Sequence, residues 1–148
     1  MASPGQELRN PHTGQTLIFK RTAGDTGGDL LEVESVWEQQ GPQPPSHFHP
    51  SQEEHFEVLE GTLQVEIGGA RRTLSEGDRI VVPAGTVHAM WNEGPGTTRA
   101  AWVTQPALRT EQFFERAWGL AAGTVDERLG ATLLDDFSDE FRLAPSGA

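Results

Sequence analysis

Short apolar stretches, interrupted at regular intervals by glycine and proline, constrain the fold of this chain more than any other feature. The 148 residues include 17 Gly and 10 Pro, which are spread along the sequence rather than gathered in one tract. Segments of alternating polar and apolar residues recur between them at the spacing that is typical of a β-sandwich or β-barrel. The sequence therefore predicts a mostly β fold of many short strands joined by turns.

Eight segments carry the alternating pattern and are predicted to be strands. They are residues 16–22, 30–38, 54–60, 62–67, 70–74, 79–82, 87–91 and 98–104. Successive side chains of a strand point to opposite faces, so Leu31, Val33, Ser35 and Trp37 should share one face of their strand. Residues 1–15 are interpreted as a loop, and residues 138–148 as a frayed end.

The pattern changes after Pro106. Residues 110–120 place Phe113, Phe114 and Trp118 near one stripe at helical spacing, and residues 125–136 are predicted to form a second short helix. We expect these helices to pack on the outside of a barrel or across its mouth, with the apolar stripe as core rather than as a functional lid. Residues 1–148 are interpreted as a single domain, with a barrel over about 16–106 and a helical extension over about 107–137.

Composition excludes several classes of function. The net charge is -11 at pH 7, which disfavours nucleic acid and anionic membrane surfaces as partners. There is no Cys, so disulfides, thiolate catalysis and Cys-ligated zinc are ruled out. We see no secretory signal and no apolar stretch long enough to cross a bilayer, and we therefore predict no membrane association and a cytoplasmic location.

Four side chains could converge on a metal ion. His47 and His49 are two residues apart, so both imidazoles would face one space if the chain is extended there. Glu54 begins a later alternating segment, and His88 lies near the start of another. Three imidazoles and one carboxylate suit Fe, Mn, Ni, Co, Cu or Zn and suit calcium poorly. Four ligands would leave positions open for water, oxygen or substrate.

Two segments carry motifs that point to a known family. Residues 41–61 match the pattern G(X)5HXH(X)3,4E(X)6G, and residues 77–92 match G(X)5PXG(X)2H(X)3N, with fifteen residues between them. The chain thus resembles the cupin superfamily, in particular its small single-domain bacterial-type members. The resemblance implies an antiparallel β-barrel of the jelly-roll or double-stranded β-helix kind, with one divalent transition metal ion on His47, His49, Glu54 and His88. It also implies a homodimer.

Neighbouring residues admit alternative assignments. Glu53 satisfies the looser spacing of the first motif, but only Glu54 leaves six residues before Gly61. Alternation points His55 away from the other ligands, so we interpret it as an outer-face residue. Asn92 is expected to bind the backbone rather than a substrate.

The reaction is less constrained than the site. Trp37, Phe56, Met90 and Trp102 are expected to line the barrel interior, which favours an aromatic or otherwise apolar small-molecule ligand. The resemblance implies a metalloenzyme that acts on a small organic molecule, such as an aromatic or dicarbonyl substrate. Dioxygenase-type oxidoreductase chemistry is favoured because no second carboxylate and no Lys is placed as a general base. The alternatives are a non-redox isomerase, cyclase or decarboxylase on the same metal, and a small-ligand binding or sensing module without catalysis.

Overall fold

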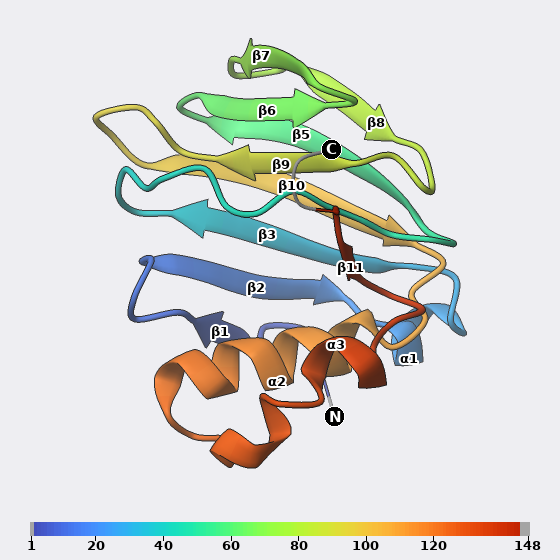
Figure 1. Ribbon diagram of the computed structural model, residues 1–148. Helices are drawn as coiled ribbons and strands as arrows, with labels where there is room; N and C mark the ends of the chain where they lie inside the picture. The colour runs from blue at the N-terminus through green and yellow to red at the C-terminus, as the bar shows by residue number, and fades with distance from the viewer. Residues whose placement is uncertain (1, 146–148) are drawn as a thin grey trace.

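Two antiparallel sheets face each other in the computed structural model, which describes residues 2–145 (Figure 1). The larger sheet has the order β1-β2-β3-β10-β5-β8, and the smaller has the order β11-β4-β9-β6-β7. The strands of the larger sheet are β1 (Glu7–Arg9), β2 (Gln15–Arg21), β3 (Leu31–Trp37), β10 (Thr98–Gln105), β5 (Glu53–Glu60) and β8 (Arg79–Val82). Those of the smaller sheet are β11 (Arg142–Leu143), β4 (His47–Phe48), β9 (His88–Trp91), β6 (Leu63–Ile67) and β7 (Ala70–Leu74).

Helices cover one end of this pair of sheets (Figure 1). They are α1 (Ala23–Thr26), α2 (Thr110–Ala122), the 3-10 turn η1 (Glu127–Leu129) and α3 (Leu133–Asp136). The long helix α2 contributes Phe113 and Phe114 to a buried cluster with side chains of β2 and β3. A second buried cluster, with Phe56 and Leu63 among its members, joins the facing sheets. At one end of the molecule the core is therefore formed by the two sheets packing against each other, and at the other end by α2 packing against β2 and β3.

The alternation in the sequence has a direct structural outcome. Leu31, Val33 and Ser35 of β3 are each at most 1% exposed, because this face is turned toward the interior. Gly61 closes the turn after β5 with φ 76°, and a Cβ there would lie 2.4 Å from the carbonyl oxygen of Thr97. Only glycine fits at this position, and its lack of a side chain lets the end of β5 approach Thr97, just before β10.

The predicted mostly β jelly-roll fold with C-terminal helices is confirmed, with one difference in closure. Hydrogen bonds among residues 2–145 leave the two sheets separate, so the strands form a sandwich rather than a closed barrel. The eight predicted strands are present, with ends that shift by one residue or not at all.

Three predictions about the ends of the chain are wrong. Residues 7–9 form β1, which pairs with β2 at the edge of the larger sheet. The expected second helix is interrupted at Gly130, where η1 ends before α3 begins. Part of the segment predicted to be frayed forms β11 against β4, although residues 146–148 lie outside the described residues.

No helix within residues 2–145 combines the length and the apolar character needed to cross a membrane.

Candidate metal centre

Three histidines project from neighbouring positions of the smaller sheet. His47 on β4 lies directly opposite His88 on β9 in the antiparallel register. His49 follows β4 by one residue, and its backbone carbonyl accepts a hydrogen bond from Gly85. The two-residue spacing of His47 and His49 therefore places both rings on the side of His88, with ring centroids 4.4–5.2 Å apart among the three.

A single carboxylate faces these rings from the larger sheet. Glu54 lies on β5, which is held between β10 and β8, and its side chain is 1% exposed. The indole Nε1 of Trp102 on β10 donates to Glu54 Oε2 at 2.6 Å. The other oxygen, Oε1, lies 2.8 Å from His88 Nε2 and 3.0 Å from His49 Nε2. The carboxylate is thus fixed by one sheet and directed at the histidines of the other.

The outer nitrogen atoms of two rings are held by backbone carbonyl groups. His49 Nδ1 lies 2.7 Å from the Glu140 carbonyl oxygen, and His88 Nδ1 lies 2.8 Å from that of Thr86. A carbonyl oxygen can only accept, so each Nδ1 must carry the hydrogen. In the neutral rings, each Nε2 then presents its lone pair to the interior, which is the tautomer that a metal ligand requires.

These lone pairs need a positive charge between them and the carboxylate. His49 Nε2 is buried and has no well-aligned hydrogen-bond partner, although Glu54 Oε1 is near. Buried acceptors that face one another are costly unless a proton or a cation lies between them. One ligand atom from each of His47, His49, Glu54 and His88 lies within 4.8 Å of the others. Three imidazoles and a carboxylate at this separation fit a divalent transition metal ion.

The four side chains also shift one another's pKa values. Burial, with the positive charges of His88 and His49, lowers the pKa of His47 to about 3. Burial acts to raise the pKa of the Glu54 carboxyl, but His49 and His88 outweigh burial and hold that pKa well below its usual range. Burial likewise acts to lower the pKa of His49, but Glu54 raises it above 6.5. The site therefore keeps Glu54 ionised and His47 neutral, which are the ligating forms of both.

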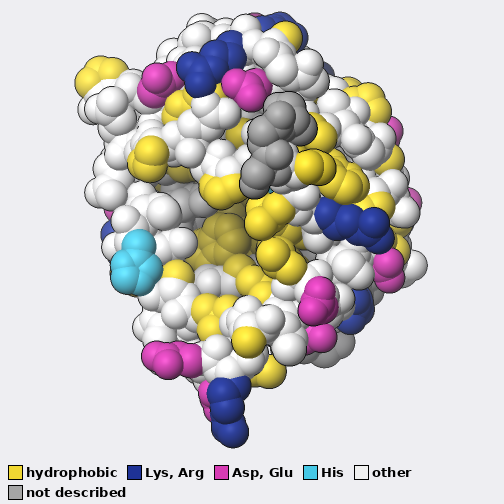
Figure 2. Space-filling view, in the orientation of Figure 1, with side chains coloured by type: hydrophobic (Ala, Val, Ile, Leu, Met, Phe, Trp, Pro, Cys, Tyr) yellow, Lys and Arg dark blue, Asp and Glu magenta, His cyan; other side chains and the backbone are white. Residues whose placement is uncertain are grey.

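A cavity of about 710 Å³ opens onto the four side chains. Figure 2 shows a hollow on this face of the molecule, with hydrophobic side chains along its floor. The four pocket residues predicted from the sequence all lie in its wall: Trp37, Phe56, Met90 and Trp102. Of residues 2–145, those that line the cavity include neither Lys nor Arg. The space thus suits an uncharged, apolar ligand.

The sequence reasoning missed the part of the wall that comes from the C-terminal segment. The helix α2 adds Phe113, Phe114 and Trp118 to the cavity, so its apolar stripe is both core and wall. Beyond α3, Phe141 stacks on His47 with ring centroids 4.6 Å apart, and Glu140 supplies the carbonyl described above. The alternation of the charged Glu140 and Arg142 with the apolar Phe141 and Leu143 was the available signal for an extended segment.

Two residues beside the motif ligands have structural environments. His55 points outward, and its Nε2 lies 2.8 Å from Glu53. Asn92 donates to the Gly96 carbonyl at 2.8 Å and accepts from the Gly94 N–H at 3.0 Å, so it binds the backbone.

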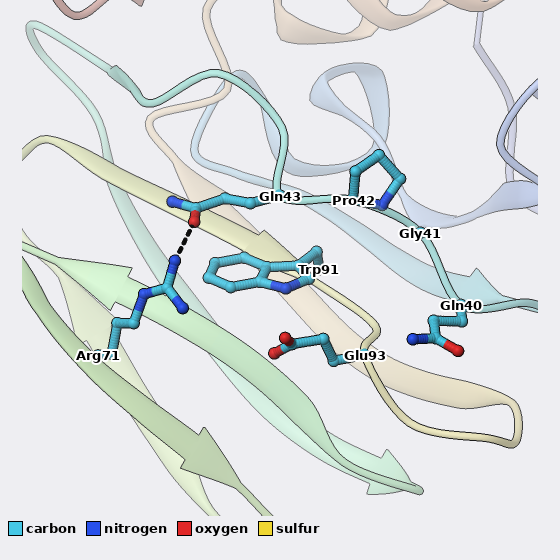
Figure 3. A pocket seen from close by; sticks show the side chains of 7 residues that line it. All are labelled: Gln40, Gly41, Pro42, Gln43, Arg71, Trp91 and Glu93. Atoms are coloured by element: carbon cyan, nitrogen blue, oxygen red, sulfur yellow. Dashed lines mark hydrogen bonds between the residues drawn. The ribbon is translucent and has the colours of Figure 1, made fainter.

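A second, shallower hollow of about 430 Å³ lies beside the 40–43 segment. Figure 3 shows Arg71 lying over the Trp91 ring and donating to Gln43, and the guanidinium carbon is 5.3 Å from the ring centroid. Arg71 also pairs with Glu66. Arg71 thus already has a carboxylate, an amide oxygen and an aromatic ring as partners.

Sequence comparison agrees with the arrangement of the site. Residues 34–104, which hold all four clustered side chains, match the family model described as the cupin domain. The chain contains a cupin domain. The region of the match extends from β3 to β10, and the cupin match therefore excludes α2 and everything C-terminal to it.

Several named proteins are similar to this region of the chain in sequence or in fold. "Probable oxidoreductase yanE" of Aspergillus niger is 48% identical over 97 residues, which cover 64% of this chain and 31% of that protein. Quercetin 2,3-dioxygenase of Bacillus subtilis is 36% identical over 82 residues, which cover 51% of this chain and 24% of the enzyme. The chain thus spans about a quarter to a third of the length of these two relatives. The solved structure of KdgF from Halomonas sp. superposes with a TM-score of 0.61 at 21% identity, covering 72% of this chain and 93% of that one.

Proposed function

We propose that this cupin is a metal-dependent oxidoreductase that acts on an uncharged, aromatic small molecule and binds its metal through His47, His49, Glu54 and His88. The observation that carries the proposal is the convergence of these four side chains on a cavity with aromatic walls and no cationic side chain in its described lining. No Lys or Arg side chain would pair there with a phosphate or carboxylate group, so the metal ion would be the sole positive partner of an anionic substrate. A flat, neutral substrate would need no such partner.

The chain's own residues would divide the work as follows. The three imidazoles and Glu54 would hold the ion, and the Trp102 indole would fix the direction of the Glu54 carboxylate. The stacked rings of Phe56 and Trp102, with centroids 5.3 Å apart, would position a flat substrate and exclude water. When bound, a divalent transition metal ion would supply Lewis-acid or redox chemistry at the positions that four ligands leave open.

The names of the relatives support redox chemistry over the alternatives. The protein from A. niger is named an oxidoreductase, and the enzyme from B. subtilis a dioxygenase. Each is considerably longer than this chain, so we extend to it the class of reaction and no particular substrate. The non-redox alternatives would use the same ligands and differ in needing no oxygen.

Two variants provide a direct test. Protein purified without added metal, the His88→Ala variant and the His55→Ala variant would be compared by elemental analysis and by oxygen consumption with neutral polyphenols and dicarbonyl compounds. His55 is the matched control because it lies on the next position after Glu54 and points outward. We expect nearly one equivalent of metal and oxygen-dependent turnover in the parent and in His55→Ala, and neither in His88→Ala.

Other outcomes would reassign the function. Turnover that proceeds unchanged without oxygen would replace the oxidoreductase with an isomerase, cyclase or decarboxylase. Metal and ligand binding without turnover would favour a binding or sensing module. A parent protein that takes up no metal even on reconstitution would refute the proposal as a whole.

A further inference from the structure

The last segment of the described chain, residues 137–144, lies directly on the metal centre, and we name it the C-terminal strap. Its Glu140 carbonyl meets His49 Nδ1, and its Phe141 ring stacks on His47 on one side and on Phe113 of α2 on the other. Backbone pairing of β11 with β4 and a 2.9 Å bond from Ala144 N–H to the Ser46 carbonyl continue the contact. The strap therefore touches two of the four proposed ligands.

One ion pair fastens the strap to the start of α2. The Glu140 side chain is 3% exposed, and its Oε1 lies 3.1 Å from the Arg109 guanidinium. Its Oε2 accepts from the Arg109 backbone N–H at 3.2 Å. The same guanidinium lies 4.9 Å from the centroid of the Phe137 ring. A buried carboxylate is strongly destabilising without its partner, so loss of Arg109 should release Glu140 toward solvent and move its carbonyl off His49.

We propose that the Arg109–Glu140 pair is a latch that positions His49 for metal binding, so that docking of the C-terminal strap and binding of the metal stabilise each other. The latch keeps the Glu140 carbonyl on Nδ1, which holds the hydrogen there and leaves Nε2 free to ligate. Arg109 and Glu140 are thus positioning residues that act through His49. This inference rests on the proposed metal site but on no particular reaction.

Thermodynamic linkage gives the proposal a measurable consequence in the unaltered protein. If a docked strap strengthens metal binding by some factor, bound metal must strengthen docking by the same factor. Cleavage of a locally opened segment by a protease follows the population of the open form. Metal should therefore protect the strap from proteolysis and leave segments outside the site unprotected.

Two arginines provide the protected bond and its control. Trypsin can cleave after Arg142, within the strap, and after Arg128, which lies in η1 with 90% of its side chain exposed. Chelator-treated full-length protein would be digested with and without Zn²⁺, and each cleavage rate followed by mass spectrometry. We expect Zn²⁺ to slow cleavage after Arg142 about tenfold and to change cleavage after Arg128 less than twofold, in line with the effect of outer-sphere partners on metal affinity.

A pair of variants separates the latch from general stability. Arg116 is the matched control for Arg109, because it also lies over Phe137, at 4.8 Å, but pairs with the exposed Asp136. We expect Arg109→Ala to weaken Zn²⁺ binding, measured by competition with a chelating dye, about tenfold, and Arg116→Ala to change it less than twofold. Arg109→Lys should recover part of the affinity, because it restores the charge without the fork of donors.

The outcomes distinguish the latch from the metal site beneath it. Protection restricted to Arg142, with the expected order of affinities, would support the latch. Zn²⁺ binding that protects both bonds equally, or that is weakened alike in Arg109→Ala and Arg116→Ala, would overturn the latch and leave the metal site standing. No Zn²⁺ binding by the parent would overturn both. If Arg109→Ala fails to fold, the proteolysis of the parent and the Arg109→Lys variant still decide the question.

Discussion

The two walls of the metal centre are held in place by very different means. The sheet wall carries three of the ligands on strands and His49 directly after β4, and Glu54 and His88 are at most 2% exposed. The C-terminal strap is attached by the two residue pairs of β11, the Arg109–Glu140 ion pair, single hydrogen bonds to His49 and Ser46, and the rings of Phe137 and Phe141. Segments with few buried contacts open at a lower free energy than the whole fold does. The ligands should therefore resist perturbation where their outer partners do not.

The sharpest test of this contrast is the removal of a ligand charge from the sheet wall. Glu54→Gln should weaken metal binding by at least about 100-fold, because it removes a coordinating charge rather than an outer partner. Glu53→Gln is the control, since Glu53 is the neighbouring carboxylate and pairs on the outer face with His55. Isothermal titration with Zn²⁺ measures both. Equal losses in the two variants would mean that the carboxylate ligand is wrongly assigned.

On the part of the strap that touches the metal centre, Phe141 should contribute more to folding than Leu143 does. Phe141→Ala removes the ring that stacks on His47 and Phe113 and should lower the free energy of unfolding by roughly 2 kcal/mol, less than for a fully buried ring. Leu143→Ala, in the same strap but 46% exposed, should cost less than about 0.5 kcal/mol. Urea unfolding of the metal-free proteins gives both values. Similar costs would contradict the assignment of Phe141 as the anchor of the strap.

Acid titration tests the neutral histidine under that ring. His47 has a pKa of about 3 when folded and 6.5 when unfolded, so the unfolded state binds more protons between these values. Its contribution to stability is complete above pH 6.5 and is lost as the pH falls toward 3. Metal-free protein should therefore lose about 2 kcal/mol more than His47→Asn does when the pH falls from about 6.5 to 5. If the parent and His47→Asn lose the same free energy of unfolding in urea as the pH falls, then His47 is not the group that causes the loss.

His49 should change the stability of the metal-free protein with pH in the opposite direction to His47, because its pKa is raised rather than lowered. Burial acts to lower its pKa, but Glu54 raises it above the unfolded value of 6.5. The contribution of His49 is present below that value and is lost as the pH rises through the folded pKa. His49→Asn should therefore fail to gain the stability that the metal-free parent gains when the pH falls toward 6.5. An unchanged profile would show that the Glu54 carboxylate does not act on this ring.

The smallest effect is expected from the outer partner that lies on the sheet itself. Trp102→Phe keeps an aromatic ring beside Phe56 but removes the 2.6 Å donor to Glu54 Oε2, and should weaken metal binding about tenfold. Phe56→Leu, which alters the stack but no hydrogen bond, should change the affinity less than twofold. The reverse order would mean that ring packing, not the indole N–H, holds the carboxylate.

The sheet wall was predictable from the sequence and the strap was not, for a physical reason. Alternation and turn glycines specify strands locally, and the two motifs place His47, His49, Glu54 and His88 at spacings that strand geometry turns to one side. The pairing of β11 with β4 joins residues about 95 positions apart, and β11 has only two residues. The alternation around Phe141 and Leu143 covers too few residues to distinguish a strand from an irregular end, so the C-terminal end was interpreted as frayed.

Other features of the fold also divide into those that local sequence patterns predict and those that depend on long-range packing. The burial of Phe113 and Phe114 was expected from helical spacing, but their place in the cavity wall depends on how α2 meets β2 and β3, which the local pattern does not encode. The break between η1 and α3 lies at Gly130, which the apolar pattern of 125–136 concealed. The separation of the strands into two sheets likewise depends on tertiary packing rather than on any single segment.

The main-chain origin of the outer partners has an evolutionary consequence. His49 and His88 each direct Nδ1 at a peptide carbonyl, of Glu140 and Thr86 respectively, and any amino acid at those positions offers the same oxygen. Residue 86 could therefore vary among relatives while the tautomer of His88 stayed constant, whereas residue 140 is also held by its ion pair with Arg109. Substitution of the Thr86 side chain would overlook this carbonyl, whereas replacing the peptide bond after Thr86 with an ester, a poorer acceptor, would reveal it.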